Sequence, residues 1–164
     1  MAASHALDTQ VVEVLGRNRL VSELLRAGLE VATPARDRGI DLIAYVDLKS
    51  HIDAFIARPI QMKAASTRHF SIYKKQAKIR DLILAFVWHL EDPGKAVTYG
   101  LTYAEAEHVA DRMGWTKTDS WRNKGGYSTQ QPSQRLVELL PQYKMTSTAW
   151  WEKVVGTTRR PTRR

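Results

Sequence analysis

The chain of 164 residues contains no cysteine. Disulfide bonds and metal sites built on thiolates are therefore excluded. The histidines show no metal-ligand spacing on a common helix, so we do not expect a zinc site; they are His5, His51, His69, His89 and His108.

Long hydrophobic runs are also lacking. No stretch approaches the roughly 18 apolar residues that a membrane span needs, and the first ten residues, MAASHALDTQ, lack the apolar core of a signal peptide. We therefore expect a protein without membrane partners and with a cytoplasmic location. A Gly-rich phosphate loop, a G-x-S-x-G elbow and an H-E-x-x-H motif are absent as well.

The length and the hydrophobic content of 43% are those of one domain with a real core, which we assign to residues 1–156. The formal net charge is +8, and half of this excess comes from arginines in the last six residues. The tail, residues 157–164, is expected to be disordered. It could lie against phosphates without sequence preference or simply keep the protein soluble, and composition does not decide between these roles.

Two apolar, β-branched segments, residues 40–46 and 55–62, predict neighbouring antiparallel strands joined by the polar connection 47–54. Because side chains alternate faces along a strand, Gln61 and Lys63 should share one face while Met62 points the opposite way. Asp41, near the start of the first strand, can then meet them across the pair.

These residue types suit a hard cation such as Mg²⁺ or Mn²⁺, which prefers oxygen ligands. Asp41, the Gln61 side-chain carbonyl and the Met62 backbone carbonyl could supply them, with Lys63 positioning water and offsetting charge on a phosphate. Alternatively, Lys63 ends an edge strand and reaches water, and Asp41 caps a turn after Gly39. Spacing alone leaves both interpretations open.

A helix ending in LLRAG, a strand at residues 30–33, then GIDLIAY and PIQMKA together resemble the PD-(D/E)xK nuclease superfamily. The Gln-x-Lys form is similar to Mrr-like and Holliday-junction-resolvase-like members, and the likeness covers residues 15–89. It implies an α/β, restriction-endonuclease-like αβββαβ core with a mixed central sheet, including a helix between the strand at 55–62 and the next. It also implies that Asp41 is the metal-binding acid, Gln61 the second ligand and Lys63 the catalytic lysine.

The first helix is expected to bury an apolar stripe and to end at Gly28; the stripe comprises Val11, Val14, Leu15, Val21, Leu24 and Leu25. Asn18 falls inside this stripe and should face the sheet. Superfamily members often carry a metal-binding Glu near this place, and Asn18 is the nearest equivalent, because Glu13 and Glu23 lie about 140° round the helix. Asn18 could equally be a buried amide satisfied by backbone groups.

A basic cluster with interleaved aromatics follows the Gln-x-Lys motif over residues 66–81. Such residues could contact the phosphate backbone beside the scissile bond, or they could form a solvated helix face. The candidates for nucleic-acid binding are Arg68, Tyr73, Lys74, Lys75 and Lys78.

The apolar segment 81–90 predicts a central strand, and residues 96–101 predict its antiparallel neighbour, completing a core over residues 11–101. Thr102 should cap a helix over residues 103–113, with Glu105 closing a capping box. Residues 102–156 are expected to form a C-terminal helical elaboration.

Within this elaboration, Trp115, Trp121 and Tyr127 lie in a turn-rich stretch. They could stack on bases, although anchoring of an irregular segment to the core is the favoured interpretation. Short helices are predicted at residues 133–140 and 147–155, packed on the core or at a subunit contact.

The predicted function is that of a Mg²⁺-dependent endonuclease that hydrolyses DNA phosphodiester bonds, and a homodimer would supply the two sites that cutting both strands requires. A competing prediction is a catalytically inactive nucleic-acid-binding or assembly protein that retains the nuclease fold. Asn18 and Gln61 stand where acids would bind metal better, which favours the second prediction.

Overall fold

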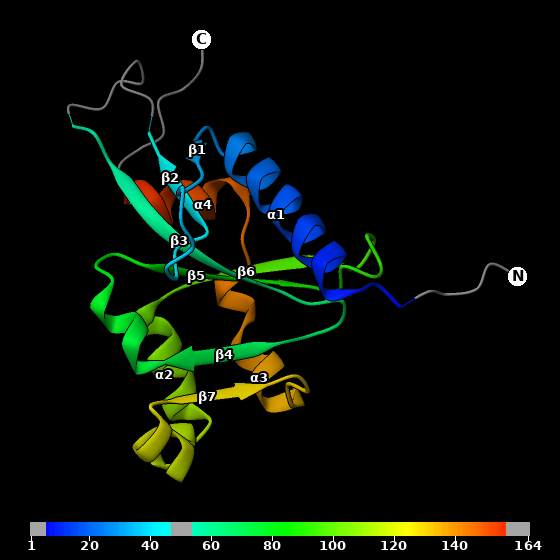
Figure 1. Ribbon diagram of the computed structural model, residues 1–164, viewed down its shortest axis with the longest axis vertical. Coiled ribbons are helices and arrows are strands. Elements are labelled where there is room, and N and C mark those ends of the chain that lie inside the picture. The colour runs from blue at the N-terminus through cyan, green and yellow to red at the C-terminus, as the bar shows by residue number, and fades with distance from the viewer. Residues whose placement is uncertain (1–5, 47–53, 157–164) are drawn as a thin grey trace, which may run out of the picture.

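A computed structural model describes residues 6–46 and 54–156 of the chain. Its centre is a five-stranded mixed sheet in the order β1-β2-β3-β5-β6 (Figure 1). The strands β1, β2 and β3 form an antiparallel meander, β5 runs parallel to β3, and β6 is antiparallel to β5. Their bounds are Glu30–Ala32, Leu42–Tyr45, Ala57–Ala64, Ile83–Trp88 and Val97–Thr102.

The predicted α/β class with a mixed sheet is confirmed, as is the antiparallel pairing of the strands predicted at 40–46 and 55–62. Most of their predicted connection, residues 47–53, lies outside the described residues. The predicted central strand is β5, which is buried along its whole length. Its Ile83, Ala85 and Val87 belong to a core on one face of the sheet, and Leu84 and Phe86 belong to a second core on the other.

The first face is covered by α1, Thr9–Arg26, and by α4, Ser147–Val155 (Figure 1). Helix α1 begins after Asp8, whose carboxylate accepts a hydrogen bond from the Val11 N–H at 2.9 Å. The fully buried Trp150 of α4 joins the same core, and its indole N–H donates to Glu23 of α1 at 3.1 Å. The C-terminal helix predicted at 147–155 thus closes the core beneath α1.

The predicted inward face of α1 is wrong. The residues that α1 buries are Val12, Gly16, Leu20 and Leu24, which recur every fourth position, whereas four of the six predicted stripe residues are exposed: Val11, Val14, Leu15 and Leu25. The reason is Gly16, because a residue without a side chain gives no hydrophobic signal yet marks the closest approach of the helix to the sheet. Asn18, expected to face the sheet, is exposed.

The second face carries a smaller sheet, in which β4, Phe70–Tyr73, pairs antiparallel with β7, Gly126–Thr129. Helices α2, Tyr103–Arg112, and α3, Gln134–Leu139, complete this layer (Figure 1). The capping box that begins α2 is confirmed: the Glu105 N–H donates to the Thr102 hydroxyl at 3.2 Å, and the Thr102 N–H donates to the Glu105 carboxylate at 2.7 Å.

Anchoring by the C-terminal aromatics is also confirmed for the two tryptophans. Trp115 and Trp121 are only 7% and 6% exposed, and Trp115 stacks on Tyr127 of β7 with ring centroids 4.2 Å apart. These rings therefore serve the core of the second face. Short 3₁₀ and π-helical turns carry the chain between α2 and β7 and between α3 and α4; they span Trp115–Lys117, Ser120–Lys124 and Pro141–Tyr143.

The connection from β3 to β5 contains no α-helix, contrary to the expected αβββαβ order. Strand β4 and the 3₁₀ helix Lys74–Lys78 occupy this part of the chain. Phe70 and Ile72 are fully buried against the second core, and β-branched and aromatic residues of this kind favour a strand once a partner such as β7 is present. In the described part of the chain, every helix is too short or too polar to cross a lipid bilayer.

Candidate active site

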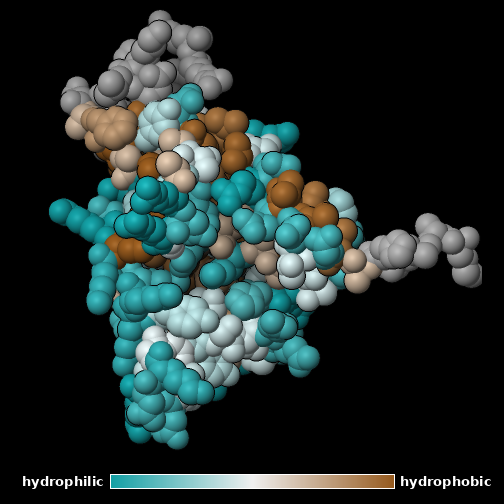
Figure 2. All heavy atoms as spheres, viewed as in Figure 1, coloured by the Kyte–Doolittle hydropathy of each residue, from teal (hydrophilic) through white to brown (hydrophobic). Residues whose placement is uncertain are grey.

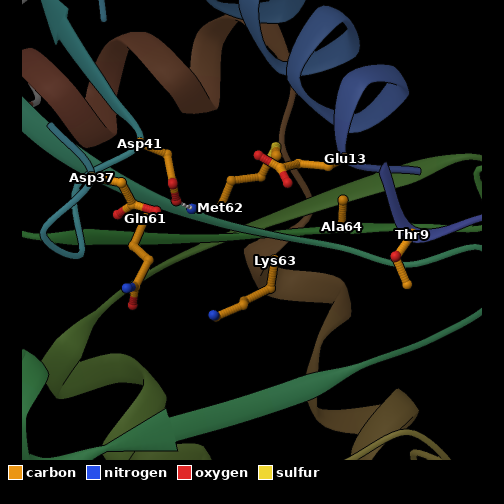
Figure 3. Close-up of a pocket in the computed structure, with 8 residues that line it drawn as sticks. All are labelled: Thr9, Glu13, Asp37, Asp41, Gln61, Met62, Lys63 and Ala64. Atoms are coloured by element: carbon orange, nitrogen blue, oxygen red, sulfur yellow. Dashed lines mark hydrogen bonds between the residues drawn. The ribbon is translucent and has the colours of Figure 1, made fainter. Parts of the chain in front are cut away.

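A polar pocket of about 270 Å³ opens where β2 and β3 part (Figure 3). It gathers the four residues predicted to form the metal and catalytic site, together with residues from α1 and from the loop before β2. The lining residues are Thr9, Glu13, Asp37, Asp41, Gln61, Met62, Lys63 and Ala64.

The backbone hydrogen bonds between β2 and β3 end at Asp41. Beyond this point the Asp41 side chain, rather than its backbone, bonds to β3. Its backbone N–H donates to the Ile60 carbonyl at 2.8 Å, and its carboxylate Oδ2 accepts from the Met62 N–H at 2.7 Å. Within a strand, the N–H and C=O of one residue point toward the same neighbouring strand. The Met62 carbonyl therefore faces this open edge of β3 beside the carboxylate. The bond to Met62 uses one Asp41 oxygen, so the other can accept a further partner.

Burial raises the pKa of Asp41 above its usual value, and the nearby Asp37 carboxylate adds to this rise. The hydrogen bond from Met62 and the positive charges of Arg17 and Lys63 act in the opposite direction. Desolvation thus dominates, and a cation placed at this edge would stabilise the ionised carboxylate.

Gln61 and Lys63 share the face of β3 opposite to Met62, as predicted. Ile60 and Met62 are buried in the core beneath α1, while Gln61 and Lys63 stand level with Leu84 and Phe86 of β5, which belong to the second core. Figure 3 shows both side chains extending from β3 in the same direction, away from Glu13. The pocket consequently wraps around the exposed edge of β3.

A buried glutamine in the 3₁₀ helix fixes the orientation of Gln61. The backbone N–H of Tyr73 can only donate, and it does so to the Gln76 side-chain oxygen at 2.8 Å. Gln76 must therefore present its NH₂ group to Gln61, whose oxygen accepts from it. Gln76 is 3% exposed, so this relay is held inside the protein.

This relay has a chemical consequence for Gln61. One lone pair of its carbonyl oxygen is already occupied by Gln76, and its Nε2 lies beside Gly39, where an added β-carbon would sit 3.5 Å away. The Gln61 N–H groups, which lie on the side of Gly39, are thus the hydrogen-bonding groups that Gln61 can offer to a ligand. Neither Gln76 nor this orientation was predicted, because a glutamine fifteen residues beyond Gln61 carries no local signal of the contact.

Glu13 is the acidic residue that α1 contributes to the pocket, in place of Asn18. Arg17 positions it: one guanidinium nitrogen donates to the Glu13 carboxylate and the other to the Asp41 backbone carbonyl, each at 3.1 Å. Asn18 lines a different hollow beside Val21 and Leu25. Asn18 lies apart from the pocket because the row of α1 that faces the sheet is not the predicted one. Reading Gly16 as an inward position would have placed Glu13 nearer the sheet.

The predicted nucleic-acid-binding residues lie at the two ends of β4. Lys74, Lys75 and Lys78 are exposed on the 3₁₀ helix that carries Gln76. The Lys74 ammonium group lies 5.4 Å from the centroid of the Trp121 ring. The Lys75 ammonium group lies 5.7 Å from the centroid of the Tyr73 ring.

At the opposite end of β4, Arg68 precedes the strand, and its Nε lies 3.4 Å from the His89 imidazole. Arg68 and His69 line a second hollow that shares Thr9 and Ala64 with the first pocket. Arg68 thus lies next to the candidate site, whereas the three lysines lie on the 3₁₀ helix whose Gln76 contacts Gln61.

The donor set can be compared with what a divalent cation requires. Among the described residues, no three His, Cys, Asp or Glu side chains form a group that could hold a metal ion by themselves. Mg²⁺ nevertheless is commonly held by one or two carboxylates, with waters and substrate phosphates completing its six oxygens. The Asp41 carboxylate, the Met62 carbonyl and the nearby Glu13 carboxylate fit that pattern.

Comparison of the chain with family models, with curated proteins and with solved structures found no match.

Proposed function

We propose that this protein is a Mg²⁺-dependent endonuclease that hydrolyses phosphodiester bonds in DNA, and that its central sheet is a restriction-endonuclease-like core. The observation that carries the proposal is the contact between Asp41 and the Met62 N–H. It sets an ionisable acid and a backbone carbonyl at one exposed strand edge, with Lys63 on the adjoining position of the same strand.

The strand topology supports the proposed core. Three successive strands β1, β2 and β3 that precede β5 in a mixed sheet agree with the strand order that the nuclease resemblance implies. The proposal takes β4 and the 3₁₀ helix as a replacement for the crossover helix of that core. The 3₁₀ helix that carries Lys74 and Lys75 contacts Gln61 through the Gln76 amide, so a phosphate backbone that follows this helix would lead to the Gln61–Lys63 face.

In this proposal Asp41 and the Met62 carbonyl hold the cation, with Glu13 closing the site from α1. Bound Mg²⁺ would supply Lewis-acid polarisation of the phosphate and a lowered pKa of water. Lys63 offsets the negative charge that develops on the phosphate. Gln61, whose oxygen is engaged by Gln76, donates its amide N–H to a phosphate oxygen.

The surrounding basic residues hold the DNA backbone without reading its sequence, because phosphate contacts position a duplex but carry no base information. Lys74, Lys75 and Lys78 lie at one end of β4 and Arg68 at the other. Tyr73, beneath Lys75, orients that lysine.

A second candidate function is a catalytically inactive DNA-binding protein with the same basic surface. The observation that favours it is the Gln61 oxygen, which is occupied by Gln76 at the place where an acidic metal ligand would be expected. In that case the pocket carboxylates serve folding, and the basic residues alone carry the function.

The two candidates are distinguished by comparing binding and cleavage on the same labelled substrates. Supercoiled plasmid, linear duplex and branched DNA would be incubated with the protein in EDTA, in Mg²⁺ and in Mn²⁺. The endonuclease proposal predicts binding in all three conditions and strand breaks only with a metal. Binding without breaks on every substrate in either metal would reject it in favour of the inactive binder.

A further inference from the structure

A second hollow, of about 420 Å³, continues the candidate active site and shares Thr9 and Ala64 with the first pocket. In Figure 2, hydrophobic atoms lie along the course that α1 follows in Figure 1, whereas the surface from the N-terminal end of this helix toward β4 and β7 is mostly teal to white. The first pocket contains the carboxylates of Glu13, Asp37 and Asp41, whereas no carboxylate of the described residues lines the second hollow. The polar residues that line it are Thr9, Ser66, Thr67, Arg68, His69, Gln130 and Gln131. The second hollow can therefore take an anionic ligand beside the proposed cation site.

Arg68 is the arginine of this hollow, and it is half-buried. Its Nε donates to a His89 ring nitrogen at 3.4 Å, and a ring nitrogen that accepts carries no proton. Three other half-buried arginines each pair with a carboxylate: Arg17, Arg19 and Arg58. Among the described residues, Arg68 has no such partner. Its two terminal nitrogens are therefore left for a ligand, and a planar guanidinium binds a phosphate through two parallel hydrogen bonds.

The loop from β3 to β4, which carries the arginine, is fixed by hydrogen bonds from the end of β5. The His89 N–H donates to the Thr67 carbonyl, and the Trp88 indole N–H donates to the His69 carbonyl, each at 2.7 Å. Burial lowers the pKa of His69, and the positive charge of Lys63 lowers it further, so this ring lies within electrostatic reach of Lys63. The second hollow is thus a preformed neighbour of the candidate active site, and a ligand group bound there is already oriented toward it.

The remaining lining of the second hollow has the chemistry that a nucleobase requires. Gln130 and Gln131 follow β7 and are exposed, and neither side-chain amide has a hydrogen-bond partner among the described residues. An amide both donates and accepts, so it can pair with the edge of a base. Leu7 and Val12 add apolar surface for the flat ring. The volume lies in the range of small-ligand pockets, roughly 300–1,000 Å³, and so leaves room for a whole nucleotide beyond its phosphate.

We propose, resting on the endonuclease function proposed above, that the second hollow binds one unpaired nucleotide of the DNA strand, next to the phosphate that is cut. Arg68 holds the phosphate of this nucleotide, and Gln130 and Gln131 contact its base. A base inside a duplex is stacked and paired, so it enters such a hollow only by leaving the helix. The substrate class that follows is DNA with an unpaired nucleotide beside the cut, as in a flap or a single strand, and a fully paired duplex is the poorer substrate.

Binding in EDTA tests the proposal without requiring cleavage. Fluorescence anisotropy would compare a duplex that carries a single-stranded flap with a fully paired duplex of the same number of phosphates. The wild type should bind the flapped DNA at least about tenfold more tightly, the scale of the contacts to one unpaired base. The double variant Gln130→Ala with Gln131→Ala should reduce this ratio to about twofold or less and leave the affinity for paired DNA unchanged. Arg68→Gln should also reduce the ratio, whereas Arg112→Gln, which removes an equal charge from the exposed end of α2, should preserve it.

Cross-linking locates the unpaired nucleotide, since the chain has no native cysteine. A flap base that carries a thiol tether should form a disulfide with Gln130→Cys but not with Glu107→Cys, on the exposed side of α2. Circular dichroism would verify that each variant is folded. Equal affinity of the wild type for flapped and paired DNA would overturn the proposal even if plasmid is nicked in Mg²⁺, as would a preference that both the double glutamine variant and Arg68→Gln retain. A preference and a cross-link without strand breaks would keep the nucleotide site and reject only the endonuclease function.

Discussion

Helix α1 approaches β3 so closely that Gly16 should not tolerate a methyl group. A β-carbon added at Gly16 would lie 2.5 Å from the Ala64 β-carbon, 3.3 Å from Leu90 Cδ1 and 3.4 Å from Met62 Sδ. The Ala64 β-carbon is fixed to the backbone and cannot rotate away, so α1 must shift outward in Gly16→Ala.

The cost of overpacking a core in this way is about 1–3 kcal/mol. Replacing a helical glycine by alanine returns up to about 1 kcal/mol of helix propensity, so we expect a net loss of up to about 2 kcal/mol. Urea unfolding, followed by circular dichroism at 222 nm, measures this difference. The two urea midpoints are compared with one shared dependence of the unfolding free energy on urea concentration.

The matched control removes the opposing methyl group. Ala64→Gly alone should destabilise by roughly 0.5–1 kcal/mol, because glycine weakens a strand interior. In the double variant the clash is absent. Its loss of unfolding free energy should therefore be smaller, by at least about 1 kcal/mol, than the sum of the losses in the two single variants. A Gly16→Ala protein that is more stable than the wild type, or two strictly additive changes, would refute this description of the α1–β3 contact.

Three further predictions concern the surroundings of the site. Gln76→Leu should lower the free energy of unfolding by about 1–3 kcal/mol in urea, because it leaves a backbone N–H and the Gln61 oxygen without their partner; an unchanged midpoint would contradict the relay. Burial lowers the pKa of His69 below its usual 6.5, so the unfolded chain binds this proton more readily and stability should fall as the pH drops through 6.5. The melting temperature should therefore fall less between pH 8 and pH 5 in His69→Asn than in the wild type. If Lys74 and Lys75 contact phosphates, replacing both by alanine should reduce the slope of log K against log salt for duplex DNA by about 2, measured by fluorescence anisotropy.

The parts of the fold that sequence reasoning could predict are those with local signals. The Thr102 capping box depends on residues three apart, and the apolar run at 81–90 marks a strand whatever its neighbours are. Strand β7, Gly126–Thr129, has only a weak signal, because Tyr127 and Thr129 favour a strand but are interleaved with glycine and serine in a turn-rich stretch. It forms because β4 offers an edge, and that depends on contacts between residues more than fifty positions apart.

The candidate site divides in the same way. The convergence of Asp41, Gln61 and Lys63 followed from the period of two along paired strands, and the pocket contains all three. Glu13 and Gln76 were not predicted, since one depends on which face of α1 is buried and the other on a crossover that is not an α-helix. In both cases a tertiary contact, through Gly16 or through Tyr73, decides which side chain reaches the site.

The most direct test of the proposed active site is the rate of plasmid nicking in Mg²⁺ by Lys63→Ala, compared with Lys95→Ala, which removes an equal charge from the exposed turn between β5 and β6. Both variants should fold and bind DNA in EDTA with affinities within a few-fold of the wild type. We expect nicking to fall by at least about 100-fold in Lys63→Ala, the scale of losing one group that stabilises transition-state charge, and to stay near the wild-type rate in Lys95→Ala. Equal nicking by the two variants would contradict an active site at the edge of β3.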